Sequence, residues 1–143
     1  MAEITQRIGI SPLLAAIYTR LTTNANTSGY RIYNHAPDSA ALPYIVFGEA
    51  LDRPSAMFSS RDCKPEEIPV MFHIWSEAHG DKECAEYMDN IGKALTASAL
   101  SITGFTNLYN AVLEYAEILV DTTEPTRPVR HGVMRWHWHI NVI

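Results

Sequence analysis

The strongest constraint on the fold is a strict alternation of apolar and polar side chains near the end of the chain. Within residues 131–142 one face is apolar and consists of Met134, Trp136, Trp138, Ile140 and Val142. The other face carries Val133, Arg135, His137, His139 and Asn141. A side-chain period of two predicts a β-strand with one buried face. The same period predicts a second strand over Ile68, Val70, Phe72 and Ile74.

Two other segments have the period of a helix. Ser11 followed by Pro12 predicts a helix start, with a hydroxyl cap and a proline at the first helical position. The helix over residues 12–23 then has an apolar stripe of Leu14, Ile17, Tyr18 and Leu21. A second helix is predicted over residues 81–97, with a stripe of Cys84, Tyr87, Met88, Ile91, Ala94 and Leu95.

The remaining segments predict further strands. Residues 31–33 and 44–50 are short strand candidates, and Pro69 near the start of its strand suggests a sheet edge. Residues 107–120 fit a helix through Leu108, Val112 and Tyr115, and fit a strand through the alternating Tyr109, Ala111, Leu113 and Tyr115. Their β-branched and aromatic content favours the strand. The order of elements predicts an α+β fold, a mostly antiparallel sheet with two helices packed on one face.

Length and charge narrow the class of protein. The chain has 143 residues, which predicts a single domain over residues 1–143. It contains no apolar run near the roughly 20 residues that span a bilayer, and we expect no membrane partner. The net charge of −5 argues against a protein that coats nucleic acid. Cys63 and Cys84 match no metal-binding spacing, and we expect both to be free thiols.

A long polar connection separates two of the predicted strands. Residues 51–67 are expected to form a protruding loop, because most hairpin loops have only about 2–5 residues. Its contact candidates are Arg53, Phe58, Arg61 and Lys64. At its end Glu66 and Glu67 point to opposite sides, and we interpret the pair as a solvated loop edge.

The polar face of the last strand is the candidate site. His137 and His139 lie about 7 Å apart along a strand and can bind a metal if His73 or Glu117 supplies a third ligand. With no metal-binding motif and no carboxylate adjacent in sequence, an exposed polar face is the favoured interpretation, without metal or cofactor. A nearby arginine patch of Arg127, Arg130 and Arg135 suits an acidic protein partner. We find no nucleophile elbow, phosphate-binding loop or dinucleotide motif, and we expect no enzyme.

Several segments together resemble a known family. Residues 13–22, 31–37 and 42–49 resemble the first helix and strands of the tail completion (tail terminator) proteins of long-tailed phages and gene transfer agents. The strand ending in His73–Ser76, the helix after it and the final Arg130–Trp136 segment follow the same layout. The resemblance covers about residues 11–142.

The resemblance implies a structural protein of the virion, assembled in the cytoplasm of the bacterial host. Such proteins form a ring, usually a homohexamer, on the head-proximal end of the tail tube. The ring ends tube elongation and docks onto the head–tail connector or stopper protein. The implied partners are the major tail tube protein, the connector and further copies of the chain, and DNA passes through without specific binding. The alternatives are another head–tail neck component, a general protein-interaction module, or a metal-dependent enzyme around His137 and His139.

Rings of this kind use head-to-tail contacts, which require two different complementary surfaces on one subunit. One hypothesis places the first surface on the 51–67 loop, with Phe58, Arg61 and Lys64 as anchors. The second would be the polar sheet face with Arg135, His137 and His139. An acidic ring would let DNA slide, because basic contacts to phosphates are what hold DNA.

Overall fold

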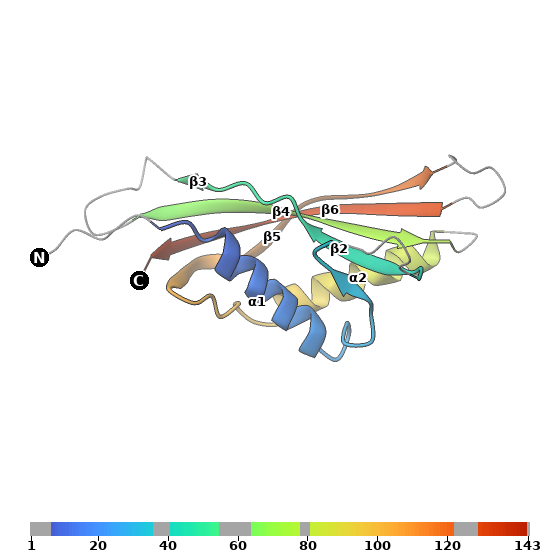
Figure 1. The fold of residues 1–143 in the computed structure, drawn as a ribbon, viewed down its shortest axis with the longest axis horizontal. Helices are drawn as coiled ribbons and strands as arrows, with labels where there is room; N and C mark the ends of the chain where they lie inside the picture. The colour runs from blue at the N-terminus through green and yellow to red at the C-terminus, as the bar shows by residue number, and fades with distance from the viewer. Residues whose placement is uncertain (1–6, 36–40, 55–63, 78–80, 122–128, 143) are drawn as a thin grey trace, which may run out of the picture.

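The fold is an α+β arrangement with both helices on one side of a single sheet, as the sequence predicts (Figure 1). The computed structural model describes residues 7–35, 41–54, 64–77, 81–121 and 129–142. In chain order the elements are α1 (Ile10–Thr23), β1 (Ile32–Tyr33), β2 (Tyr44–Gly48), β3 (Arg53–Pro54), β4 (Pro65–Ser76), α2 (Lys82–Thr96), β5 (Phe105–Asp121) and β6 (Val129–Val142).

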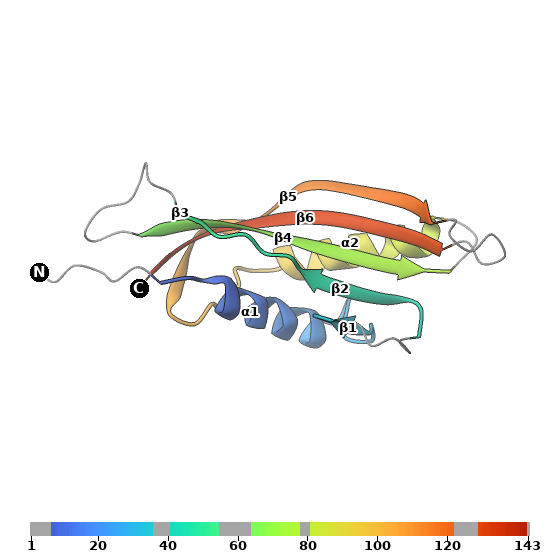
Figure 2. The ribbon, with the colours of Figure 1, turned by 45° about the horizontal axis from the view of Figure 1, so that its top comes forward.

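The sheet has the strand order β1-β2-β4-β6-β5, and β3 pairs with β4 beside this path. All pairs are antiparallel except β1 with β2. In Figure 2, β5 lies along one margin of the sheet, and β1 with α1 lies along the opposite margin. Neither helix of the described chain is long and apolar enough to cross a membrane.

The core lies between the sheet and the two helices. β4 and β6 pair in unbroken register from Pro65 opposite Asn141 to Ser76 opposite Arg130, so their apolar faces coincide. The Phe72 ring lies 6.5 Å from that of Trp138 and 5.9 Å from that of Phe47, measured between ring centroids. The predicted apolar face of the last strand is buried, which confirms the two tryptophans as core residues.

The start of α1 differs from the prediction. The helix begins at Ile10 with Gly9 as its N-cap, and no side chain caps it locally, so Ser11 is not the cap. Glu66 lies far away in sequence but is fully buried, and its Oε2 accepts a hydrogen bond from the Gly9 N–H at 3.0 Å. A carboxylate at this end is favoured by the helix dipole. The interpretation of Glu66 as part of a solvated loop edge is therefore wrong.

The buried face of α1 is rotated from the predicted stripe. Leu13, Ile17 and Leu21 are fully buried, whereas Tyr18 is 49% exposed. For α2 the predicted stripe is confirmed, since all its members are buried except the partly buried Tyr87. The Tyr87 ring stacks on Tyr30 at 3.8 Å between centroids and joins α2 to the segment after α1.

The predicted 51–67 connection is partly strand. Arg53 and Pro54 form β3 opposite Glu67 and Glu66, because β4 begins at Pro65 and extends beyond its apolar stretch. Residues 55–63 of this connection lie outside the described part of the chain.

Pro69 lies in the interior of the sheet, and its suggested edge position is wrong. Its carbonyl oxygen accepts a hydrogen bond from the Leu51 N–H at 3.3 Å, which shows that its backbone faces the gap between β2 and β3. The N–H and C=O of a residue point to the same side in an antiparallel strand. The missing proline N–H therefore costs no ladder hydrogen bond.

Residues 107–120 form a strand, which confirms the favoured interpretation. The simple alternation expected there is wrong, because the pairing of β5 with β6 shifts register at three places. One of these shifts lies between Leu113 and Tyr115 and leaves Glu114 as an extra residue. Such a bulge redirects the side chains around it.

Candidate functional site: the polar face of the sheet

The candidate site is the face of the sheet that points away from the helices. The unbroken register of β4 and β6 brings Glu67 opposite His139, Met71 opposite Arg135, and Trp75 opposite His131. β5 adds Tyr115 opposite Arg135 and Val112 opposite His137. The predicted trio of Arg135, His137 and His139 therefore shares one face with side chains from two other strands.

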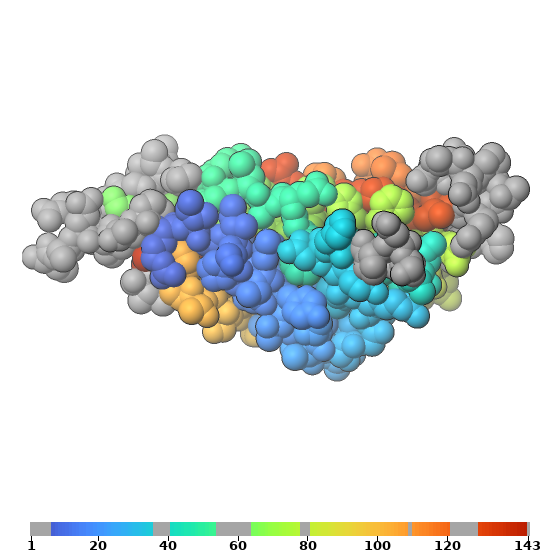
Figure 3. All heavy atoms as spheres, viewed as in Figure 1, coloured from blue at the N-terminus to red at the C-terminus, as the bar shows by residue number. Residues whose placement is uncertain are grey.

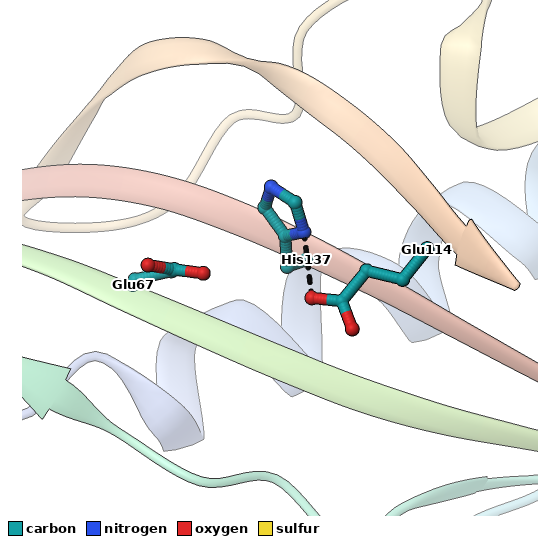
Figure 4. Close-up of side chains that lie close together, drawn as sticks. All are labelled: Glu67, Glu114 and His137. Atoms are coloured by element: carbon teal, nitrogen blue, oxygen red, sulfur yellow. Dashed lines mark hydrogen bonds and ion pairs between the residues drawn. The ribbon is translucent and has the colours of Figure 1, made fainter.

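The centre of this face is an ion-pair cluster built around Glu114 (Figure 4). Glu114 Oε1 lies 2.8 Å from His137 Nδ1, and Glu114 Oε2 lies 2.8 Å from Arg135 Nε. The side chains of Glu114, Arg135 and His137 are 25%, 32% and 16% exposed, so solvent screens these contacts only in part. The bulge in β5 brings Glu114 to this position.

Glu67 joins the cluster from β4. Single ligand atoms of Glu67, Glu114 and His137 all lie within 4.8 Å of one another. A carboxylate pair with an imidazole is a donor set that zinc accepts. His73 and Glu117, the third ligands suggested by sequence, are not part of this group, and neither is His139.

Two arginines pair with the carboxylates of this cluster. Arg53 Nη2 lies 3.4 Å from Glu67 Oε1, and Arg135 neutralises Glu114. An arginine is always charged in a protein, and its planar donors match a carboxylate. A divalent ion would have to displace both arginines, so the arrangement favours a closed polar network.

A second network lies on the same face. His73 Nδ1 is 2.8 Å from His131 Nε2, and His73 Nε2 is 2.8 Å from Glu49 Oε1. The His131 ring stacks on Trp75 at 3.8 Å between centroids. The backbone reaches Glu49 through Gly48 at φ 148° and Glu49 itself at φ 52°. The face therefore carries imidazoles, carboxylates and an aromatic ring.

The other predicted contact residues do not all share this face. Arg53 lies beside it through its pair with Glu67. The Lys64 backbone N–H donates to Asn141 Oδ1 at 2.8 Å, which ties the start of β4 to β6. Phe58, Arg61 and Arg127 lie outside the described residues.

The proposed arginine patch is divided between the two sides of the sheet. Arg130 Nε lies 3.4 Å from Asp81 Oδ1 at the start of α2, on the helix side. Arg135 is on the polar face, because residues five apart in a regular strand point to opposite sides. The expectation that these two arginines form one patch is therefore wrong.

The buried thiol of Cys84 is not part of the polar face. Cys84 is a free cysteine on the buried face of α2. Burial raises the pKa of its thiol to about 11, and the nearby charges of Asp81 and Glu83 act in the same direction. A thiol that keeps its proton is a poor nucleophile. Cys63, the other candidate thiol, lies outside the described residues.

Sequence reasoning missed four members of the polar face, namely Glu49, Glu67, Glu114 and His131. Glu67 and His131 follow the strand period and could have been found from it. Glu114 could not, because regular alternation places Glu114 and Tyr115 on opposite faces, whereas the bulge brings both side chains to the face of Arg135. Glu49 comes from a turn whose course depends on the surrounding sheet.

Comparison with known proteins shows which family the chain matches and which fold it shares. A family model described as "Tail completion protein gp17" matches residues 15–141. No curated protein matches the chain. A solved structure titled "Virion of native gene transfer agent (GTA) particle" contains a chain with a TM-score of 0.77 and 14% sequence identity. The similarity covers 95% of this chain and 99% of that chain, and it shows a shared fold.

Proposed function

Because the chain belongs to the tail completion protein gp17 family, we propose that it caps the head-proximal end of a virion tail tube as a ring. The ring ends tube elongation and forms the docking surface for the head connector. The single observation that carries the proposal is the family match, which spans nearly the whole chain. A virion particle also contains a chain of the same fold, and this supports a place in the particle.

The proposed partners are further copies of the chain, the major tail tube protein and the connector or stopper protein. A ring subunit has lateral contacts with its neighbours and axial contacts with the tube and the connector. The sequence hypothesis gave the polar face around Arg135, His137 and His139 to a neighbouring subunit, and we propose instead that it meets an axial partner. Polar, partly exposed groups of both signs suit a docking surface that two separately assembled structures must find.

The 51–67 connection is a second candidate for an axial contact. Its described ends are held by the sheet, with Arg53 in β3 and Lys64 at the start of β4. The anchors proposed within it are Phe58 and Arg61.

The charge of the chain suits the passage of DNA. A ring of six copies, each with a net charge of −5, offers little to trap phosphates. The polar face adds no excess of positive charge, because its two arginines are paired with Glu67 and Glu114. We therefore propose that DNA crosses the ring without specific binding.

The test is electron microscopy of particles from a strain that lacks this gene. The proposal expects overlong tails without heads beside filled heads without tails. Normal tails joined to normal heads would contradict it. Tails of normal length that fail to join heads would favour the alternative, a connector or other neck component.

The contact residues are tested by complementing that strain with variants. Phe58→Ala with Arg61→Ala should abolish capping if the connection is a contact, and unchanged capping would remove it from the proposal. Ala85→Asp, on the exposed side of α2, is the control for an unrelated surface change.

A further inference from the structure

The most exposed apolar surface of the described chain is the edge strand β5. Six of its large apolar side chains are between 40% and 49% exposed, namely Leu108, Val112, Leu113, Tyr115, Leu119 and Val120. β5 is the last strand of the sheet and pairs only with β6 among the described residues. Proteins protect such edges with lysine or proline, and residues 105–121 contain neither. The edge is therefore suited to pairing with another surface.

The charge of β5 excludes a second β5 as a good partner. Residues 105–121 contain no lysine or arginine, and their acidic residues are Glu117, Asp121 and Glu114, of which Glu114 pairs with Arg135 of β6. Two copies that pair through β5 would bring acidic strands together, and like charges at close range are destabilising. The surface that fits β5 must be apolar and free of acidic residues.

The opposite margin of the sheet has these properties. A groove of about 590 Å³ lies between α1 and the β1–β2 edge, and its apolar lining includes Leu14, Tyr18, Ile32, Tyr33 and Phe47. Figure 3 shows α1 and the segment after it, in blue to cyan, covering the lower front of the molecule.

The charge of this margin is opposite to that of β5. Residues 10–35 contain Arg20, Arg31 and His35 and no acidic residue, in a chain whose net charge is −5. The Arg20 side chain donates a hydrogen bond to the Ala94 carbonyl oxygen at the end of α2. Arg31 is exposed and donates a hydrogen bond of 3.3 Å to the Pro43 carbonyl oxygen. Arg31 is therefore the cation that a partner would meet.

We propose that neighbouring copies join laterally by docking the β5 edge of one copy into the α1–β1 groove of the next. The inference rests on the proposed ring and names the surfaces that build it. The two surfaces differ and lie at opposite margins of one sheet (Figure 2), so each copy offers one of each. Repetition of such a heterologous contact produces a closed ring when its rotation closes.

A site-specific cross-linker tests the contact in assembled particles. The full chain, with Leu119 replaced by the photo-reactive residue p-benzoylphenylalanine, is supplied to the strain that lacks the gene. Purified particles are irradiated and their peptides are identified by mass spectrometry. The expected product joins residue 119 to residues 8–35 of a second copy. Cross-links to another segment or another protein, or no cross-link from particles that contain the protein, would overturn the proposal.

The matched control places the same reactive residue at Ala85, which is exposed on α2 and belongs to neither surface. No product with residues 8–35 is expected from it. Equal cross-linking from positions 85 and 119 would show non-specific proximity and would also overturn the proposal.

A charge reversal tests the same contact through assembly. Glu117→Arg and Arg31→Glu should each lower the yield of joined particles at least about tenfold, and the double variant should recover most of that loss. Failure of each single variant to lower the yield, or a double variant worse than both, would contradict the docking. The circular dichroism spectrum and unfolding midpoint of each purified variant establish that it folds.

Different results would overturn the proposed capping function and the proposed lateral contact. Normal joined particles without the gene would overturn the capping function itself. Overlong tails without the gene, together with cross-links from residue 119 to a different segment, would overturn only the lateral contact.

Discussion

Arg20 Nη1 of α1 lies 2.9 Å from the carbonyl oxygen of Ala94 in the last turn of α2. The same guanidinium also donates to Ser98 O and Ser98 Oγ at 3.0 Å each, and to Ala99 O at 3.3 Å. The last carbonyls of a helix have no partner within it, and a cation there is favoured by the helix dipole. The Arg20 side chain therefore caps the C-terminus of α2 and links the two helices.

Replacement of Arg20 should destabilise the protein. Arg20→Ala removes four charge-assisted hydrogen bonds and should lower the free energy of unfolding by about 1–3 kcal/mol. Arg20→Lys should lose less, because an ammonium keeps the charge but not the planar fork. Denaturant unfolding measures both. Arg31→Ala, which loses one longer hydrogen bond, is the control, and an equal loss there would contradict the capping role.

Gly132 of β6 should not accept a side chain. A Cβ at this position would lie 2.5 Å from Cys84 Sγ and 3.4 Å from Met88 Sδ. Gly132→Ala should therefore cost about 1–3 kcal/mol through overpacking. Cys84→Ala in the same chain removes the sulfur and should recover part of that loss. If the double variant is no more stable than Gly132→Ala alone, the close approach is not the cause.

The stability of the protein should fall in alkaline solution through Cys84. Its ordinary pKa is 9.0, and burial raises the pKa in the folded protein to about 11. Between these values the folded chain keeps a proton that the unfolded chain has lost. This contribution to stability is complete below pH 9 and is lost as the pH rises towards 11, at a cost of about 2 kcal/mol.

The measurement is the free energy of unfolding from pH 8 to pH 11, compared between the wild type and Cys84→Ala. The variant lacks the thiol, so its curve should fall less steeply while all other titrating groups stay the same. Parallel curves would mean that the Cys84 thiol does not contribute. At pH 8 a thiol reagent should leave Cys84 of the folded protein unmodified.

The ion-pair cluster should bind zinc only after its arginines are removed. Arg53→Ala with Arg135→Ala leaves Glu67, Glu114 and His137 with ligand atoms within 4.8 Å and removes the arginine that pairs with each carboxylate. Calorimetric titration should then show zinc affinity at least about tenfold above the wild type. Addition of His137→Ala should abolish the gain. Equal zinc binding by the wild type and the double variant would show that the arginines do not occupy the site.

Much of the architecture could be predicted from local pattern. The two-residue period of the last strand separates Trp136 and Trp138 from His137 and His139, and the structure keeps that division. The apolar stripe of α2 was also readable, because Cys84 and Ile91 recur at helical spacing. These features depend on neighbours within a few residues, and they can therefore be predicted from the sequence.

The contacts within the candidate site were harder to predict from the sequence. Glu66 and Glu67 are adjacent in the sequence, yet the first holds the N-terminus of α1 and the second pairs with Arg53 on the other face. The alternation of the strand predicts opposite faces, but it does not reveal what each face meets. The partner of Glu66 is 57 residues away in the chain, and only the folded sheet brings it close.

The sequence alone determined that the apolar faces of β4 and β6 are buried, that the chain has two helices and that the class is α+β. Periodicity carries this information because side-chain direction repeats with the backbone of each element. The tertiary structure alone decided that Glu114 reaches His137 and that Glu66 holds the start of α1. A bulge is a mismatch between two paired strands, and the position of such a mismatch is a property of the pair rather than of either segment.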